Sequence, residues 1–433
     1  MTNDNGQLSV NRRGFLKATS ALAAGAAVPS ILATGAWARA SDDTIRVGII
    51  GCGGRGTGAA YDALNADPAV RITAMADLFE DRLKSSLGYL ANEESFKGRV
   101  AVPDERRFVG FDAYQQLLDA GDVDYVILAT PPGFRPIHFE AAVRSGVHVF
   151  FEKPVAVDPA GIRRVIEAGR SAKAQNLSII TGTQRRHEHS YLAAMEQVRS
   201  GLIGEIVSAR CYWNQGGLWV HDRKPEYSSM EWMCRNWLYF DWLSGDHICE
   251  QHVHNLDVMN WAIGSTPEKA VGMGGRQVRT DAKFGNIFDH FAIEYEYPNG
   301  VSVMSMCRQI DGCAGRVEEV LVGTKGVMTL RPNYAHARTN SGEWRAPENP
   351  ISPYQQEHVD LIASIRGGKY LNEAQRVAES TLTAIMGRMS AYTGKEVSWD
   401  FAGSSALDLT PTAFEFADMN ANPVPTPGRT ELI

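Results

Sequence analysis

A glycine-rich segment directly after a short apolar run constrains the fold of this chain more than any other feature. The run Thr44–Ile50 is rich in β-branched residues and stops at Gly51-Cys52-Gly53-Gly54-Arg55-Gly56, and an alanine-rich helical stretch follows over Ala59–Asn65. In a strand–turn–helix unit the first glycine permits a tight turn, the second lets the backbone approach a pyrophosphate, and the third lets helix and strand pack closely. Free N–H groups at the start of such a helix attract phosphates. The segment therefore predicts a dinucleotide-binding turn.

A carboxylate follows at the place where a dinucleotide site needs one. A second predicted strand, Val70–Ala76, ends at Asp77, 26 residues after Gly51. A carboxylate there hydrogen-bonds the hydroxyls of the adenosine ribose and repels the 2′-phosphate of NADP. The sequence therefore favours NAD as cofactor, while the nearby Arg82 leaves NADP possible.

Strand-like and helix-like stretches alternate as far as residue 181. The helical stretches Ile137–Ser145 and Ala160–Ala174 separate three further apolar strand runs, which are Val123–Ala129, His148–Phe151 and Leu177–Thr181. This alternation predicts an α/β fold with a doubly wound parallel sheet.

The second half of the chain has a different pattern, which predicts an open and largely antiparallel sheet. Apolar and polar residues alternate over Gly272–Arg279, Phe288–Tyr297 and Val301–Arg308, and a shorter strand is expected at Val327–Leu330. The polar stretch Pro332–Pro353 is long enough to suggest a lid or an arm. Helical periodicity returns at Gln355–Ile365 and Ala374–Tyr392, and the tail from Ala402 is expected to wrap the surface or reach a neighbouring subunit.

The N-terminus resembles an export signal. Arg12 and Arg13 precede a weakly apolar, alanine-rich run from Ala18 to Trp37, which is the twin-arginine pattern. The predicted division is an export signal at 1–40, a dinucleotide-binding Rossmann domain at 41–182, a substrate and dimerisation α+β domain at 183–400, and an irregular tail at 401–433. We expect export to the periplasm in the folded state, with the twin-arginine translocase as a partner. A retained, membrane-anchored form is the alternative.

Composition excludes two classes of protein. The net charge of −7 argues against a nucleic-acid binder that neutralises phosphates. No stretch of 18 residues after residue 40 is free of charge, which argues against a protein with several membrane spans.

Three motifs together resemble a known family. The glycine loop, Ala129-Thr130-Pro131-Pro132 with His138, and Glu152-Lys153-Pro154 are similar to those of the glucose–fructose oxidoreductase / inositol dehydrogenase / rhizopine catabolism (Gfo/Idh/MocA) family, over about residues 44–400. The resemblance implies a Rossmann domain followed by an α/β domain on an open sheet that forms homo-oligomers, dimers or tetramers. It implies nicotinamide-dependent oxidoreductase activity on sugars and cyclic polyols. The cofactor contacts that follow are Gly51, Gly53, Gly54, Arg55, Gly56, Asp77, Thr130, Pro131, His138, Glu152 and Lys153.

A second segment resembles the family's catalytic helix. If Gly245–Trp261 forms one helix, Glu250, His254 and Asp257 share a face, similar to the family motif D-x-x-x-H-x-x-D. By this match His254 is the general acid/base, because an imidazole suits proton transfer near neutral pH. Lys153 stabilises the alkoxide and exchanges the proton. Glu250, a glutamate where the family has aspartate, orients these groups or binds a hydroxyl. A merely structural His254 is the alternative.

The stretch from Arg185 to Trp261 holds six of the eleven His and six of the nine Trp. Tryptophan faces pack on sugar rings and polar groups bind ring hydroxyls, so this region suits a carbohydrate pocket, although about half of these Trp are expected in the core or at subunit contacts. Arg186 is as readily a structural salt bridge as a ligand contact. No metal site is expected, because Glu250 and His254 supply only two ligands. Thr183–His187 lies where the family has an N-x-R-like substrate and cofactor contact. With this resemblance, that of the helix motif and the tryptophan argument, the predicted substrate-binding residues are Gln184, Arg186, His187, Trp213 and Asp257.

The leading functional hypothesis is an exported NAD(P)-dependent oxidoreductase of sugars or cyclic polyols. Because the periplasm has no free nicotinamide pool, the cofactor is expected to stay tightly bound. One alternative is a glycosidase or lyase that acts by transient oxidation and elimination. Another is a non-catalytic sugar-binding protein on the same fold.

Overall fold

The first sheet is parallel throughout, as the alternating pattern predicts. The computed structural model describes residues 44–433, so the predicted twin-arginine signal lies outside the described residues. The sheet order is β3-β2-β1-β4-β5-β6, and the chain reverses its direction of growth between β1 and β4, where a doubly wound sheet leaves a ligand crevice. The strands are β1 (Ile45–Ile50), β2 (Val70–Asp77), β3 (Arg107–Val109), β4 (Tyr125–Leu128), β5 (His148–Phe151) and β6 (Ile179–Thr181).

Helices cover both faces of this sheet because its strands are apolar on both sides. Val47 and Ile49 point to one face, where they pack with α1 (Gly54–Ala66), α2 (Glu80–Asn92) and α11 (Pro353–Gly367). Ile50 and Val126 point to the other face, with α3 (Ala113–Asp119), α4 (Arg135–Arg144) and α5 (Pro159–Ala174). This side-chain alternation has the period of two that a strand imposes. The predicted doubly wound α/β domain is confirmed.

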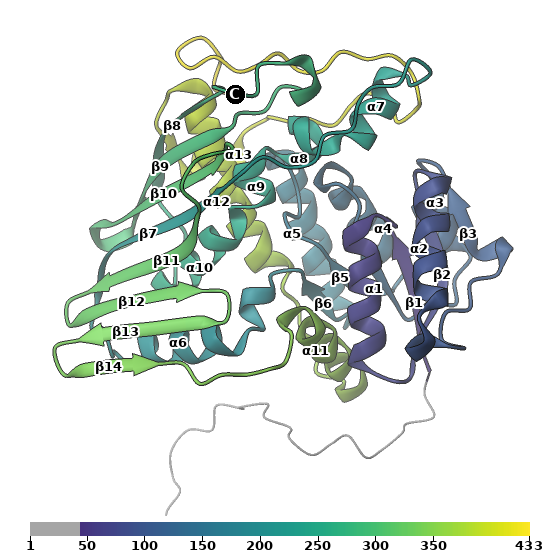
Figure 1. Cartoon of the computed structure of the whole chain (residues 1–433), viewed down its shortest axis with the longest axis horizontal. Helices are drawn as coiled ribbons and strands as arrows, with labels where there is room; N and C mark the ends of the chain where they lie inside the picture. The colour runs from purple at the N-terminus through teal and green to yellow at the C-terminus, as the bar shows by residue number, and fades with distance from the viewer. Residues whose placement is uncertain (1–43) are drawn as a thin grey trace, which may run out of the picture. The chain divides into compact units, whose positions relative to one another are not determined.

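The second sheet has nine strands in the order β14-β13-β12-β11-β7-β10-β9-β8-β15. Every neighbouring pair is antiparallel except β7 and β10. One face packs against α6 (His189–Arg199), α10 (Val253–Ile263) and α12 (Ala374–Thr393). Figure 1 shows α10 and α12 between the two sheets. The strands are β7 (Ile206–Gln215), β8 (Lys269–Gly275), β9 (His290–Tyr297), β10 (Val301–Gln309), β11 (Arg316–Gly323), β12 (Gly326–Arg331), β13 (Tyr334–Thr339), β14 (Gly342–Arg345) and β15 (Val397–Ser398).

The expectation of a lid or arm over Pro332–Pro353 is wrong for much of that stretch. β13 and β14 form a hairpin that extends the second sheet. Ala335 and Ala337 alternate into the core and are buried. Alanine is a poor strand signal, so a strand whose inward residues are alanines is hidden in the sequence.

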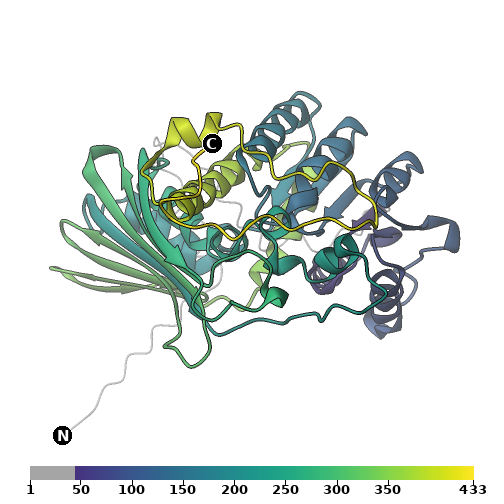
Figure 2. The ribbon, with the colours of Figure 1, turned by 90° about the horizontal axis from the view of Figure 1, so that it is seen from above.

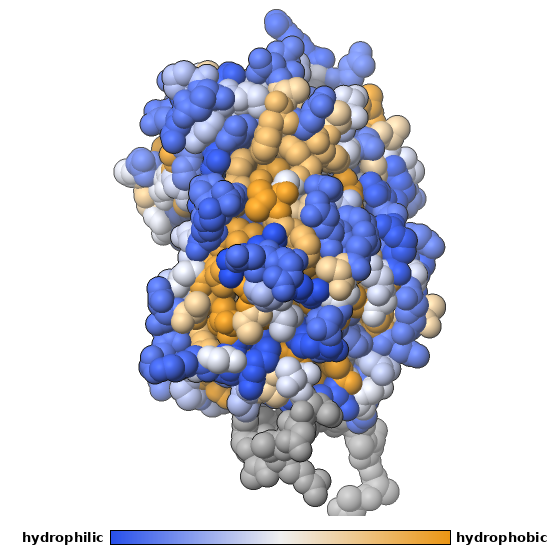
Figure 3. Space-filling view, turned by 90° about the vertical axis from the view of Figure 1, so that its right-hand side faces the viewer, coloured by the Kyte–Doolittle hydropathy of each residue, from blue (hydrophilic) through white to orange (hydrophobic). Residues whose placement is uncertain are grey.

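The tail after α13 (Trp399–Ser404) has no regular elements and follows the surface, the first of the two predicted outcomes. Figure 2 shows it running from α13 toward the first sheet and then returning, so that the C-terminus lies near α13. From the side on which β3 lies, polar residues flank a band of apolar residues down the middle of the face (Figure 3). None of the helices between residues 44 and 433 combines the length and apolar character needed to cross a bilayer.

A buried ion pair between Arg185 and Glu319 ties the start of the second half to β11, with side chains 2% and 0% exposed. Glu319 also accepts hydrogen bonds from Tyr191 Oη at 2.8 Å and Asn255 Nδ2 at 2.7 Å. Removing one partner of such a pair leaves an uncompensated buried charge.

We therefore expect Arg185→Ala to lower the free energy of unfolding by about 3–5 kcal/mol, measured by urea denaturation. The control Arg170→Ala removes an exposed pair with Glu167, with side chains 71% and 77% exposed, and should cost less than about 1 kcal/mol. Equal losses in the two variants would contradict the prediction.

Candidate functional site

A cavity of about 630 Å³ lies at the carboxyl ends of the parallel strands. One wall is formed at or just after the ends of β1, β2, β4, β5 and β6, by Gly51, Asp77, Thr130, Lys153 and Gly182 in that order. The opposite wall comes from the second half of the chain and includes Trp213, Glu250 and His254. The cavity therefore occupies the crevice that the strand order predicts.

The glycine loop has the shape that a pyrophosphate site requires. Gly51 has φ +99°, and a Cβ there would lie 2.5 Å from the backbone nitrogen of Thr130. A Cβ on Gly56 would lie 1.8 Å from the carbonyl oxygen of Gly51, so helix and strand touch as predicted. Gly53 and Gly54 face open space, and no side chain caps the start of α1. The first N–H groups of α1 are therefore available to an anion.

Asp77 lies beside this loop. Its Oδ2 accepts a hydrogen bond from the backbone of Cys52 at 2.6 Å, and its Oδ1 accepts one from Phe79 at 2.8 Å. Burial raises the pKa of Asp77, and the two backbone donors oppose that shift. The side chain lines the cavity together with Arg82, so the end of the cavity marked by Asp77 suits a ribose and the glycine loop suits the phosphates.

Thr130, Pro131 and His138 also line the cavity. Thr130 Oγ1 and His138 Nδ1 lie 3.1 Å apart. Burial, and then the charge of Arg135, lower the pKa of His138 to about 3. This histidine is therefore neutral and holds the loop after β4 rather than carrying charge.

The helix expected over Gly245–Trp261 is interrupted, and the single-helix prediction is wrong. α9 (His247–Glu250) stops before Gln251, and α10 begins at Val253. The backbone N–H of His254 donates to Gln251, with N and O 3.4 Å apart, instead of to Glu250. The Glu250 carbonyl is therefore available to another donor.

Lys153 uses that carbonyl. Its Nζ lies 2.6 Å from the Glu250 carbonyl oxygen and 3.1 Å from Glu250 Oε1. Both side chains are 12% exposed and both line the cavity. The Lys153 ammonium thus connects the end of β5 to the end of α9, 97 residues away in sequence.

His254 lines the same part of the cavity. Its ring stacks on Trp213 with centroids 5.7 Å apart, and its buried Nδ1 has no hydrogen-bond partner among the described residues. Burial lowers the pKa of His254 well below its ordinary value, and the cations of Lys153 and Arg185 lower it further. The imidazole is therefore neutral near pH 7, which is the form that accepts a proton.

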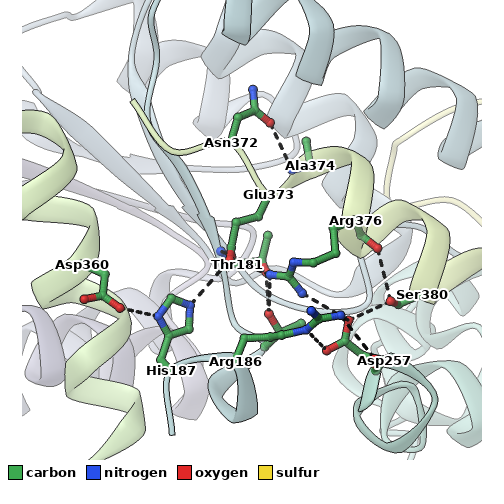
Figure 4. Close-up of polar contacts among 11 residues, drawn as sticks. Thr181, Arg186, His187, Asp257, Asp360, Asn372, Glu373, Ala374, Arg376 and Ser380 are labelled. Atoms are coloured by element: carbon green, nitrogen blue, oxygen red, sulfur yellow. Dashed lines mark hydrogen bonds and ion pairs between the residues drawn. The ribbon is translucent and has the colours of Figure 1, made fainter. Parts of the chain in front are cut away.

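Of the five predicted substrate-binding residues, Gln184 and Trp213 line the cavity, while Arg186, His187 and Asp257 do not. Asp257 accepts hydrogen bonds from Arg186 Nε at 2.7 Å and Arg376 Nη1 at 3.2 Å. Figure 4 shows this network between the end of the first sheet, α10 and α12. The carboxylate is 2% exposed, so Arg186 forms the salt bridge that the sequence allowed as its alternative.

Arg55, predicted as a cofactor contact, also has a structural role in the cavity wall. Its Nε donates to Glu152 Oε1 at 2.5 Å, and its guanidinium lies 5.2 Å from the ring centre of Tyr354. Arg55 thereby joins the glycine loop to the residue before Lys153.

Several residues of the cavity wall were missed in the sequence. Trp219, His221 and Trp237 belong to the histidine- and tryptophan-rich region, so a signal for them existed. Arg135 also lines the cavity and lies between Pro132 and His138, so its motif was a signal as well. Tyr354 lines the cavity but carries no motif, because only tertiary contacts bring it there. Among residues 44–433, no group of three His, Cys, Asp or Glu is placed to hold a metal ion.

The chain matches two family models in succession. Residues 45–180 match GFO_IDH_MocA, described as an oxidoreductase family with an NAD-binding Rossmann fold. Residues 191–329 match the GFO/IDH/MocA C-terminal domain. Together the two matches span more than half of the chain.

The curated relatives include dehydrogenases and glycosyl hydrolases. Inositol 2-dehydrogenase of Acidothermus cellulolyticus is 24% identical over 309 residues, which are 71% of this chain and 79% of that protein. A glycosyl hydrolase family 109 protein of Streptomyces niveus is 28% identical over 197 residues, 44% of this chain and 36% of that protein. The chain therefore spans only about a third of the length of the second relative.

Solved structures share the fold. Aldose-aldose oxidoreductase of Caulobacter crescentus, complexed with glycerol, has a TM-score of 0.65 at 18% identity, covering 82% of this chain and 100% of that one. Levoglucosan dehydrogenase in complex with NADH and levoglucosan has a TM-score of 0.66 at 16% identity, covering 82% of this chain and 99% of that one.

The network beside the cavity makes a pH-dependent contribution to stability. Burial alone lowers the pKa of His187, but the hydrogen bond to Asp360 and the nearby carboxylate of Glu373, 3.7 Å from Nε2, outweigh it and raise the pKa from 6.5 to about 10. His187 Nδ1 lies 2.6 Å from Asp360 Oδ2. Because the folded-state pKa is the higher one, this stabilisation is complete below pH 6.5 and disappears as the pH rises through about 10.

We expect His187→Gln to lower the free energy of unfolding by about 3 kcal/mol at pH 6. The difference from wild type should shrink steadily between pH 6.5 and 10, as followed by denaturant titration at several pH values. Arg164→Ala, which removes a half-exposed pair with Glu140, is the control and should give a small, constant difference. A difference for His187→Gln that does not change over this range would refute the prediction.

Proposed function

The chain belongs to the GFO/IDH/MocA family of oxidoreductases, and we propose that it transfers a hydride between a ring hydroxyl of a sugar or cyclic polyol and a nicotinamide held in the cavity. The observation that carries the proposal is that Lys153 and His254, from opposite walls, line the same cavity as the glycine loop and Asp77. Inositol dehydrogenases among the relatives and levoglucosan dehydrogenase among the structural neighbours support this class of substrate.

The cavity fits a nicotinamide dinucleotide along its length. Asp77 suits the adenosine ribose, the open side of Gly53 and Gly54 suits the pyrophosphate, and Lys153 with His254 marks the reactive end. The nicotinamide ring supplies the hydride acceptor when it is bound.

The reacting hydroxyl would bind between Lys153 and His254. The neutral imidazole of His254 accepts the hydroxyl proton as the C–H bond gives up its hydride. The Lys153 ammonium stabilises the alkoxide oxygen that develops. The Glu250 carbonyl and carboxylate hold Lys153 in place at 2.6 and 3.1 Å, which favours the orienting role for Glu250. In the reverse direction His254 returns the proton.

Polar and aromatic groups at this end favour an uncharged sugar. Gln184 lines the cavity, and its Oε1 is buried without a partner among the described residues, so a ring hydroxyl would satisfy it. Trp213, which stacks on His254, also lines the cavity and offers a flat apolar face to a sugar ring.

Export and cofactor retention complete the proposal. Arg12 and Arg13 ahead of an apolar run support export by the twin-arginine route to the periplasm, and a tightly bound nicotinamide would then travel with the folded protein. The glycosyl hydrolase family 109 relatives support a second candidate, a glycosidase acting by transient oxidation. Product analysis separates the two: a keto-sugar with reduced nicotinamide indicates an oxidoreductase, and a released sugar with no net change of cofactor indicates a glycosidase.

The catalytic assignment predicts the effect of two substitutions. Lys153→Ala and His254→Ala should each lower kcat at least about a hundredfold on the best substrate from a panel of sugars and inositols. Nicotinamide binding, measured by fluorescence titration, should stay within a few fold of wild type. Lys173→Ala and His290→Ala, which lie away from the cavity, serve as controls. Near-normal turnover in either catalytic variant would refute its role.

Asp77 predicts the choice of cofactor. Wild type should bind NAD at least about tenfold more tightly than NADP, and Asp77→Ser should narrow that ratio, because the substitution removes the charge that repels a 2′-phosphate. Titration calorimetry gives both affinities. Glu80→Gln changes an exposed carboxylate nearby that pairs with Lys84, and it should leave the ratio unchanged. Tighter binding of NADP by wild type would overturn the prediction.

A further inference from the structure

A third hydrophobic cluster joins three parts of the chain that are distant in sequence. The first part is the loops that follow β2, β3 and β4. The second part, called here the crossing segment, is residues 216–243, which connect β7 to α9. The third part is the tail, residues 405–433. The cluster includes Phe79, Phe111 and Phe134 from the loops, Met230, Met233, Leu238 and Phe240 from the crossing segment, and Leu409, Phe414 and Met419 from the tail.

The crossing segment contacts the end of the cavity that Asp77 marks. The Arg235 guanidinium lies 3.9 Å from the ring centre of Phe79, and its Nη1 lies 3.3 Å from Asp81. His221 Nε2 lies 3.4 Å from Arg82 Nη2. Phe79, Arg82, His221 and Arg235 all line the cavity. The crossing segment therefore supplies part of the wall around the adenosine end.

The tail packs on the outer side of the same loops. The Phe416 ring stacks on Phe79 with centroids 5.9 Å apart and lies 5.0 Å from Phe111. The ring centre of Phe414 lies 6.0 Å from that of Phe111 and 5.5 Å from that of Phe134. Neither tail phenylalanine lines the cavity, so the tail supports the wall from behind.

The tail also holds the crossing segment. The backbone N–H of Met230 donates to the Ala417 carbonyl at 3.2 Å. The backbone N–H of Ser229 donates to Asp418 Oδ1 at 2.9 Å. Figures 1 and 2 show the tail running beside α7 (Ser229–Arg235) toward the first sheet. The cavity loops, the crossing segment and the tail therefore form a closed ring of contacts.

We propose that the tail and the crossing segment form a strap that keeps the adenosine end of the dinucleotide in the cavity through successive turnovers. The inference rests on the proposed function, which places a nicotinamide dinucleotide there. For the adenosine to leave by this end, the Phe79 loop or the crossing segment must move. The contacts of Phe416 with Phe79 and of Asp418 with Ser229 oppose both movements.

A strapped cofactor restricts the net reaction. A hydride passes from one C–H bond to the cofactor, and His254 takes the hydroxyl proton. Before the next cycle the hydride has to pass to a carbonyl carbon, and the proton has to pass to the oxygen of that carbonyl. The acceptor is either a second carbonyl substrate that enters the same cavity or the oxidised form of the first substrate. The reaction class is therefore oxidation of one sugar coupled to reduction of another, or transient oxidation of a single one.

The test measures cofactor release. Protein loaded with NADH is mixed with excess ADP-ribose, and the loss of bound-nicotinamide fluorescence gives the release rate. Wild type should release NADH more slowly than it turns over. Phe416→Ala, and the double variant Phe414→Ala/Phe416→Ala, should release NADH at least about tenfold faster, because each substitution removes a ring that contacts two aromatic rings of the cavity loops. The single-turnover rate of the loaded enzyme should change less than about twofold, because the strap touches no reacting group.

Two further variants keep the proposal testable. Val424→Ala changes a tail residue about as exposed as Phe416, 45% against 47%, but without a ring that packs on Phe79 or Phe111 as that of Phe416 does. Its release rate should equal that of wild type. Asp418→Ala removes the contact with Ser229 through a side chain that is 82% exposed. It should speed release about threefold even if the phenylalanine variants fail to fold.

Three outcomes would count against these ideas, and they are distinguishable. Unchanged release from folded Phe416→Ala and Asp418→Ala would overturn the strap. Release from wild type faster than turnover would also overturn it. A wild-type protein with no affinity for NADH or NAD would instead refute the proposed function.

Discussion

The hydrogen bonds from Lys153 to Glu250 join the two halves of the chain at the cavity. The lysine comes from the end of β5, and its acceptors come from the end of α9. The Glu250 carbonyl is available because the helix stops there, whereas a continuous helix would use that carbonyl for the N–H of His254. The break in the helix therefore frees the backbone acceptor that holds Lys153 at the centre of the cavity.

Charge around that centre is arranged in pairs. Glu152 compensates Arg55, and Glu250 compensates Lys153, while burial keeps His254 neutral. A proton acceptor can thus lie beside a cation without being protonated by bulk water at neutral pH. Outside the cavity wall, Asp257 with Arg186 and Arg376 ties α10, which carries His254, to the end of the first sheet and to α12 (Figure 4).

The far end of the cavity is built on a different principle. Apolar rings and backbone hydrogen bonds from the tail and the crossing segment pack around it, and Arg235 lies on Phe79 and pairs with Asp81. The two ends of the cavity therefore differ: paired charges of Lys153 and Glu250 lie at one end, and aromatic rings of the tail back the loops at the other.

The sequence by itself determined the elements whose signal is local. The glycine loop, Asp77, and the strand just before Lys153 were predicted because strand period, turn glycines and charge all act within a few residues. Tertiary structure decided the rest. Arg186 and Asp257 are predicted ligands that pair with each other, because their segments pack together 71 residues apart. The break at Gln251, the approach of Tyr354 to Arg55 and the return of Phe416 to Phe79 depend on packing between distant segments, and no local pattern encodes that packing.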